Sequence, residues 1–133
     1  MVGGRIMTTV GEVMCSTLVS VEPTATVAEA ATVMGGRHVG STLVMVAGSL
    51  AGIFTERDIL RALSQDFDAP SHPVSSWMTP NPVTISPNTP VEEALDMMLS
   101  KGFRHLPVED GGSVIGVVSM RDLSGAIAER SGD

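Results

Sequence analysis

Apolar positions along the chain alternate between short β-branched runs and stretches of helical period. The runs at residues 18–21 and 83–85 are each followed closely by a proline, a pattern that predicts short strands. After each run, apolar residues recur at the spacing i, i+3, i+4 and i+7, which predicts a helix with one buried face. The periodic positions are Val27, Ala30, Ala31 and Met34 in the first stretch, and Val91, Ala94, Leu95 and Met98 in the second.

Two apolar strands and a second helix complete each pattern. The strands of each pair are separated by a glycine-containing turn, as in a hairpin. The second helix is expected to begin at Thr55 in the first pattern and at Ser119 in the second. The order β-α-β-β-α is therefore predicted twice. The expected strand pairs are residues 43–46 with 50–54, and residues 106–108 with 114–118.

The chain also repeats itself residue by residue. Met14 aligns with Met78, an offset of 64 residues, and the match continues without a gap until Ala62 aligns with Ala126. A register kept through turns and caps over this length indicates two copies of one structural unit. Identical pairs include Val19 with Val83, Pro23 with Pro87, Gly52 with Gly116, Arg57 with Arg121, and Asp58 with Asp122.

The duplication predicts the fold class and the domain organisation. We expect an α/β protein with two pseudo-symmetric β-α-β-β-α repeats packed sheet to sheet. Each repeat alone would leave one apolar face of its small sheet uncovered, and packing the two faces together buries both. We assign residues 10–63 to the first repeat, residues 64–76 to a linker that contains Asp and Pro, and residues 77–128 to the second repeat.

Composition and charge narrow the class of protein. The 133 residues are 43% hydrophobic and 3% aromatic, so a globular core of aliphatic and Met side chains is expected. A net charge of −7, with Lys and Arg dispersed, argues against nucleic-acid binding. No apolar stretch approaches the ~20 residues of a membrane span, and residues 1–7 lack the features of a secretory signal. The expected location is therefore the cytoplasm, without membrane association.

The single Cys15 is expected to be a small buried hydrophobe.

The segment that most suggests chemistry is Gly-Ile-Phe-Thr-Glu-Arg-Asp at residues 52–58. It is repeated as Gly-Val-Val-Ser-Met-Arg-Asp at residues 116–122. Each copy is typical of a strand that runs into the start of a helix. The glycine permits close approach of another backbone or of a ligand. The hydroxyl lies at the N-cap position of the helix, and the Asp follows three residues later.

Two interpretations of this hydroxyl and carboxylate are open. They could form a capping box that only satisfies the first-turn amides, although Glu or Gln is the usual partner in such a box. Alternatively, free amides and the positive end of the helix would attract a phosphate, while the carboxylate accepts hydrogen bonds from both hydroxyls of a ribose. The spacing alone favours neither interpretation.

At these residues the chain resembles a known family. The duplicated Gly-apolar-apolar-Thr/Ser-x-x-Asp, the preceding Leu106-Pro107-Val108 and the β-α-β-β-α order are similar to the CBS domain, named after cystathionine β-synthase. Two such domains in tandem resemble a Bateman module, and the resemblance covers about residues 10–127. It implies binding of adenosine-containing ligands, with AMP, ADP or ATP foremost and S-adenosylmethionine or NAD as further candidates. It also implies a homodimer that requires no cofactor.

The resemblance further implies two ligand-binding sets, each headed by one Asp and completed by the other repeat. In each set the Thr or Ser hydroxyl would contact phosphate, and the carboxylate would contact the ribose. The first set is Thr55, Asp58, Pro82, Val83, Arg104, His105 and Pro107. The second set is Ser119, Asp122, Leu18, Val19, Gly40 and Ser41.

Charge makes the two sets unequal. Arg104 is a planar donor suited to phosphate oxygens, and His105 changes its charge near neutral pH. The matching positions in the second set are Gly40 and Ser41, which bring no charge. We therefore expect anionic nucleotides to prefer the first set, while the second set stays empty or takes a less charged adenosine ligand.

Other candidates are interpreted as structural. His38 and His72 lack the spacing of metal ligands. Gly35 and Gly36 predict the end of the first helix. Leu43 stands where the second repeat has Pro107, a departure from the family pattern that bears on pocket shape. Three arginines near helix starts are expected to be solvated or ion-paired rather than phosphate clamps: Arg57, Arg61 and Arg121.

Three functions are compared. The leading hypothesis is a regulatory sensor in which ligand binding shifts a conformational equilibrium that a separate partner protein detects. The second is a homodimeric interaction scaffold with vestigial clefts. The third, an enzyme, lacks support because the sequence contains no nucleophile–base pair, no phosphate-binding loop with its lysine, and no metal cluster.

Overall fold

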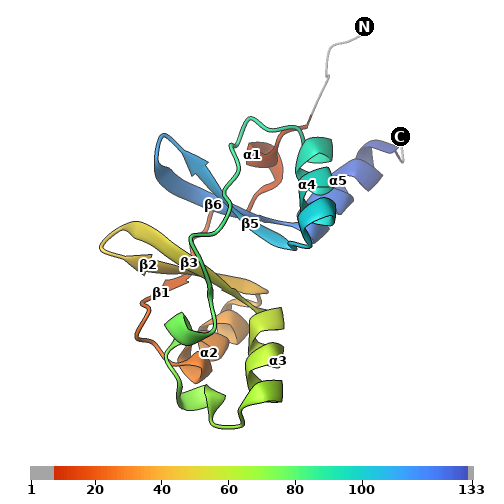
Figure 1. The fold of residues 1–133 in the computed structure, drawn as a ribbon. Coiled ribbons are helices and arrows are strands. Elements are labelled where there is room, and N and C mark those ends of the chain that lie inside the picture. Colours follow the sequence, from red (N-terminus) through yellow and green to blue (C-terminus); the bar gives the residue numbers. More distant parts are fainter. Residues whose placement is uncertain (1–7, 132–133) are drawn as a thin grey trace, which may run out of the picture. The chain divides into compact units, whose positions relative to one another are not determined.

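The computed structural model describes residues 8–131, with side-chain placement up to residue 129. The chain divides into two compact units (Figure 1). One unit is Leu18–Pro82, here called the repeat-1 unit. The other, the repeat-2 unit, combines Met1–Thr17 with Val83–Asp133. Residues 1–7, considered above as a possible secretory signal, lie outside the described residues.

The repeat-1 unit contains a four-stranded sheet of order β1-β2-β3-β4, in which β1 runs parallel to β2 and the other neighbours are antiparallel. Helices α2 and α3 lie on one face of this sheet (Figure 1). Two short 3₁₀ helices, η1 and η2, lead from α3 to β4. The bounds are β1 Ser20–Val21, α2 Val27–Arg37, β2 Ser41–Val46, β3 Ser49–Thr55, α3 Glu56–Gln65, η1 Ala69–Ser71, η2 Val74–Ser76 and β4 Thr79–Pro80.

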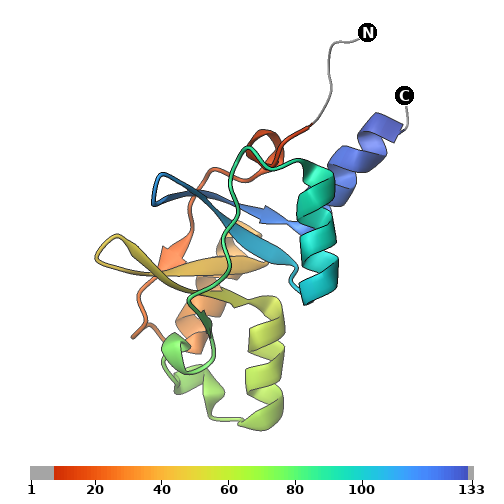
Figure 2. The ribbon, with the colours of Figure 1, turned by 45° about the horizontal axis from the view of Figure 1, so that its top comes forward.

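The repeat-2 unit is built around the hairpin β5-β6, with α4 and α5 packed side by side (Figure 1 and Figure 2). Single bridges extend the hairpin on both sides: Ile85 pairs in parallel with Val108, and Cys15 pairs antiparallel with Val117. These bridges occupy the places of β1 and β4 in the repeat-1 unit. The bounds are α1 Val10–Val13, α4 Val91–Lys101, β5 His105–Asp110, β6 Ser113–Ser119 and α5 Met120–Ser131.

Both hairpins have the same internal geometry. The pairing of β2 with β3 shifts register between Val44 and Met45, and the pairing of β5 with β6 shifts between Val108 and Glu109, 64 residues later. The turns also correspond, because positive φ angles occur at Ala47 and Gly48 in one hairpin and at Gly111 and Gly112 in the other. The duplication inferred from the sequence is thus a duplication of backbone conformation.

Each unit has its own apolar core. The predicted helical positions fill both cores, since Val27, Ala30 and Met34 of α2, and Val91, Ala94 and Met98 of α4, are buried. The repeat-1 core also contains Val44, Phe54 and Val74. The repeat-2 core also contains Val10, Ile85, Leu106, Val108, Val118 and Leu123. The mixed α/β class with two repeats is confirmed.

The segment around the start of each repeat packs in the unit of the other repeat. Val74, near the start of the second repeat, is fully buried in the repeat-1 core, and Val10, at the start of the first repeat, is fully buried in the repeat-2 core. The backbone bonds correspond as well: the amide of Val74 donates to Ala25 O (2.7 Å), and that of Val10 donates to Thr89 O (2.8 Å). The N-terminal segment therefore completes the C-terminal half of the chain.

Four local expectations were wrong or incomplete. Residues 83–85 form a single bridge instead of a strand. Gly35 and Gly36 do not end the first helix, because α2 continues to Arg37 and is capped by His38 in the left-handed region (φ 56°). Cys15 is exposed, since only its backbone joins the sheet. Short elements were also missed, namely α1, β4 and the two 3₁₀ helices within the expected linker.

The packing of residues 14–15 against β6 and of residues 78–80 against β3 explains the glycine of each repeated motif. A Cβ at Gly52 would lie 2.8 Å from the carbonyl oxygen of Thr79, and a Cβ at Gly116 would lie 2.8 Å from that of Cys15. Both oxygens belong to backbone, which cannot move aside as a flexible side chain could. The close approach anticipated from the sequence is therefore that of a neighbouring strand.

Gly52→Ala and Gly116→Ala are each expected to lower the free energy of unfolding by about 1–3 kcal/mol, because the added methyl group overpacks the contact of β3 with residues 78–79 or of β6 with residues 14–15. Denaturant-induced unfolding followed by circular dichroism would measure the loss. Gly35→Ala is the matched control: a Cβ there meets no atom within 4 Å, and alanine favours a helix by up to about 1 kcal/mol over glycine. Wild-type stability of Gly52→Ala would contradict this account.

Candidate functional site

The same cap begins α3 and α5. At α3, the hydroxyl of Thr55 accepts a hydrogen bond from the Asp58 amide (3.3 Å), and Asp58 Oδ2 accepts from the Thr55 amide (2.9 Å). At α5, the hydroxyl of Ser119 accepts from the Asp122 amide (3.0 Å), and Asp122 Oδ2 accepts from the Ser119 amide (2.9 Å). The capping box is therefore formed at both sites, with Asp in the place that Glu or Gln usually takes.

Backbone carbonyls satisfy the amide that opens each helix. The amide of Glu56 donates to Gly40 O (3.1 Å), and the amide of Met120 donates to Arg104 O (2.8 Å). The first amide of each helix is thus bonded to a carbonyl and the third to the cap hydroxyl. These two amides of each helix are therefore not free in this structure, as the phosphate-binding interpretation would require of them.

Within each unit, the predicted residues gather where the hairpin meets the helix. Ser41 is the cross-strand partner of Thr55, and His105 is the cross-strand partner of Ser119. The repeat-1 unit thereby brings together Gly40, Ser41, Thr55 and Asp58, and the repeat-2 unit brings together Arg104, His105, Ser119 and Asp122.

The other predicted residues lie on or next to the edge segments of the two sheets, except Pro107, which lies within β5. The carbonyl of Val19 accepts a hydrogen bond from Leu43 (2.9 Å), and the carbonyl of Pro107 accepts from Ile85 (3.0 Å). Leu18 and Val83 expose about two fifths of their surface, at 43% and 40%. Pro82 is the last residue of the repeat-1 unit. Each predicted ligand set draws residues from both units.

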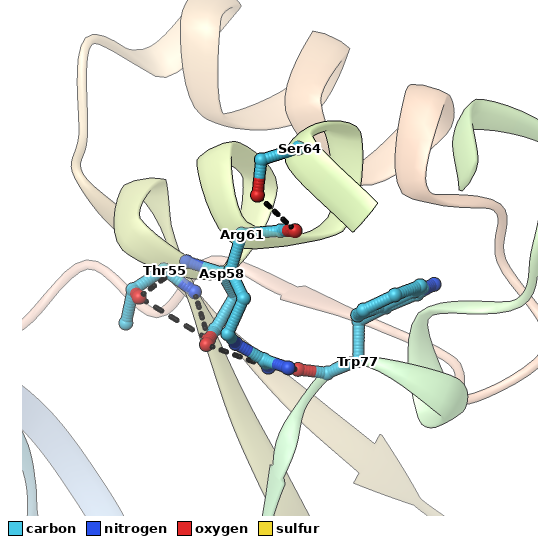
Figure 3. Close-up of polar contacts among 5 residues, drawn as sticks. All are labelled: Thr55, Asp58, Arg61, Ser64 and Trp77. Carbon is cyan, nitrogen blue, oxygen red and sulfur yellow. Dashed lines mark hydrogen bonds and ion pairs between the residues drawn. The ribbon is translucent and has the colours of Figure 1, made fainter. Parts of the chain in front are cut away.

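Asp58 has an ion pair that Asp122 does not have. Asp58 Oδ1 lies 3.2 Å from Arg61 Nη2, which also donates to the carbonyl oxygen of Trp77 at 2.7 Å (Figure 3). The Arg61 guanidinium carbon lies 5.4 Å from the centroid of the Trp77 ring, within the range of a cation–π contact. Among residues 8–131, Asp122 accepts only the bond from Ser119. The expectation that Arg61 is ion-paired is confirmed.

A further residue supports Trp77. The indole N–H of Trp77 donates to His72 Nδ1 at 3.2 Å, and the two rings stack with centroids 6.2 Å apart. His72 Nε2 in turn lies 3.6 Å from Asp66. Sequence reasoning missed Trp77, although the one Trp of the chain stands directly before Met78, where the motif alignment begins.

Between residues 8 and 129, the aligned residues of the repeat-2 unit do not repeat this group. At the offset of 64 residues, Gly125 stands for Arg61, Val13 for Trp77, and Thr8 for His72. In the described part of the chain, no group of three or more His, Cys, Asp or Glu residues could hold a metal ion. No helix between residues 8 and 131 is long and apolar enough to cross a bilayer.

Comparison with known proteins agrees with the geometry of the two units. The model of the CBS domain matches the chain twice, at residues 10–65 and 74–129. The chain therefore belongs to the CBS domain family and carries a tandem pair, the arrangement of a Bateman module. An uncharacterised 17.7 kDa protein from Acidianus ambivalens is 39% identical over 125 residues, which cover 92% of this chain and 74% of that protein.

Two solved structures illustrate the similarity of fold. A signal-transduction protein with CBS domains from Burkholderia ambifaria is 30% identical, with a TM-score of 0.87, and the match covers 92% of this chain and 95% of that one. CBSX2, solved in complex with AMP, is 26% identical, with a TM-score of 0.78, and the match covers 92% and 98%. The second case shows that a member of the family with this fold binds an adenine nucleotide.

The unequal partners of the two carboxylates predict unequal effects on stability. Asp58→Ala is expected to lower the free energy of unfolding by about 2 kcal/mol, because the variant loses the cap and leaves Arg61 without its carboxylate. Asp122→Ala is expected to lower it by about 1 kcal/mol, because only the cap is lost. Urea unfolding would measure both.

Asp96→Ala is the control for this comparison, since Asp96 is exposed on α4 and should change stability by less than about 0.5 kcal/mol. Equal losses in Asp58→Ala and Asp122→Ala would show that the Arg61 pair adds nothing to stability.

Proposed function

We propose that this chain is a regulatory module, located in the cytoplasm, that binds an adenosine-containing ligand, AMP foremost, and acts through a separate partner protein. The observation that carries the proposal is the carboxylate of Asp122. One of its oxygens caps α5, while its Oδ1 has no hydrogen-bond or ion-pair partner among residues 8–131. Such an oxygen is available to accept a hydrogen bond from a sugar hydroxyl.

Similarity to CBSX2, which binds AMP, supports an adenine nucleotide as the ligand class. The proposed ligand residues are the two sets given by the family resemblance, headed by Asp58 and by Asp122. In both sets the carboxylate would bind ribose, and in the first set Arg104 would bind phosphate. Regulation would follow from different ligand affinities of two conformations, because a ligand shifts an equilibrium only by that difference.

A second function, a homodimeric scaffold, is favoured by one observation. Leu60 and Leu63 lie at helical spacing on α3, and Phe67 follows shortly after its end; the three side chains are 71%, 47% and 86% exposed. Exposed large apolar side chains in one short segment are typical of a protein–protein contact. Dimer formation is compatible with ligand binding, so the scaffold becomes the preferred function only where no adenosine ligand binds.

Thermal melting with AMP, ADP, ATP, S-adenosylmethionine and NAD tests the ligand class. A ligand present at about 100 times its dissociation constant stabilises the folded state by about 2.7 kcal/mol, which raises the melting temperature of a domain of this size by several degrees. Asp58→Asn combined with Asp122→Asn should abolish the rise, because the amide retains a capping oxygen but loses the charge. If all five compounds leave the melting temperature unchanged, the sensor is refuted and the scaffold is preferred.

The proposed asymmetry between the sets is tested by calorimetry with AMP and adenosine. Asp122→Asn leaves the Asp58 set, and Asp58→Asn leaves the Asp122 set. The Asp58 set is expected to bind AMP about tenfold more tightly than adenosine, because a charge-assisted bond from Arg104 to the phosphate contributes about 1.5–3 kcal/mol. Arg104→Ala should remove that preference. Equal AMP affinity of the two sets would contradict the asymmetry.

A further inference from the structure

The two carboxylates differ in how many more hydrogen bonds they can accept. An ionised carboxylate offers about four lone-pair positions. Asp58 already accepts three bonds: Oδ2 accepts from the Thr55 amide (2.9 Å) and the Thr55 hydroxyl (3.2 Å), and Oδ1 accepts from Arg61 (3.2 Å). Asp122 accepts one bond, from the Ser119 amide. About one position is therefore left on Asp58, against about three on Asp122.

Arg61 is held in place rather than loosely paired. Its Nη2 donates both to Asp58 and to the Trp77 carbonyl oxygen, and its guanidinium lies over the Trp77 ring (Figure 3). Trp77 is fixed in turn by its bond to His72 and by packing against the repeat-1 core. To free Asp58 Oδ1, a ligand would have to displace a guanidinium that two further contacts, to the carbonyl oxygen and the ring of Trp77, hold beside it.

We propose that Arg61 determines specificity by limiting Asp58 to a single sugar hydroxyl, whereas Asp122 can accept both hydroxyls of a vicinal diol. This inference rests on the proposed function, in which the two carboxylates bind ribose. The Asp58 set would then distinguish poorly between ribose and 2′-deoxyribose. The Asp122 set would discriminate strongly, because loss of the 2′-hydroxyl leaves a desolvated carboxylate oxygen without its donor.

Calorimetry with AMP and 2′-deoxyadenosine 5′-monophosphate tests this difference. With Asp122→Asn, which leaves the Asp58 set, the deoxy compound should bind within about threefold of AMP. With Asp58→Asn, which leaves the Asp122 set, the deoxy compound should bind at least about tenfold more weakly than AMP. Adding Arg61→Ala to Asp122→Asn should raise the discrimination of the Asp58 set to about tenfold, because Oδ1 becomes available.

Two further variants separate this effect from a loss of structure. Trp77→Val introduces the residue that the repeat-2 unit has at the corresponding position, and it should increase discrimination partway by releasing Arg61. Gly125→Ala, at the counterpart of Arg61, meets no atom within 4 Å and should leave discrimination unchanged. Thermal melting of each variant confirms that it is folded.

The outcomes distinguish this inference from the function on which it rests. The role of Arg61 would be overturned if both sets discriminated equally between AMP and the deoxy compound. It would also be overturned if Arg61→Ala left the discrimination of the Asp58 set unchanged. Neither outcome would contradict nucleotide binding itself. Absence of AMP binding by the wild-type chain would overturn the proposed function, and the role of Arg61 with it.

Discussion

The structure depends on the close approach of one backbone segment to the second strand of each hairpin, β3 in one unit and β6 in the other. Residues 14–15 and β4 pair with β6 and β3 at the two motif glycines, where a side chain would meet a carbonyl oxygen at 2.8 Å. Each of these strands runs directly into the helix that carries the candidate carboxylate. The pairing therefore holds the strands that lead into α3 and α5, and the caps at the ends of these strands place Asp58 and Asp122. It also ties the N-terminal segment to the C-terminal half, so neither half of the sequence folds into a complete unit by itself.

The carboxylates combine two roles that draw on the same oxygens. A cap uses one oxygen of the Asp to hold the first turn of the helix, and a ribose would bind to the remaining lone-pair positions of the carboxylate. In Asp122 the two demands are compatible, because the cap occupies Oδ2 alone. In Asp58 the demands conflict, because Arg61 takes Oδ1. An ion pair that is 44% exposed on the arginine side contributes at most about 1 kcal/mol to stability, and in the proposed role of Arg61 it also limits what Asp58 can bind.

Local patterns in the sequence predicted most of the fold. The periodic apolar positions, the glycine turns and the 64-residue register are all short-range signals, and the helices and hairpins that they predicted are present. The exchange of residues 8–17 was not predicted, because it pairs Cys15 with Val117 across about a hundred positions of chain and leaves no periodic trace. The glycine pair at 35–36 was misread for a different reason: the packing of Met34 keeps α2 helical, and His38 adopts the left-handed conformation that ends it.

The candidate site was predicted at the level of residue type but not of bonding. Spacing identified Thr55 with Asp58 and Ser119 with Asp122, yet it could not decide between cap and ligand, because both use the same atoms. The structure shows that the cap is formed in both repeats, and that the repeats differ around it at Arg61 and Trp77. Both helices are capped in the same way, so the cap itself does not account for the group around Arg61 in one repeat alone. What the difference changes is the number of carboxylate oxygens that remain open to a donor, and the open Oδ1 of Asp122 is the observation that supports the proposed ligand site.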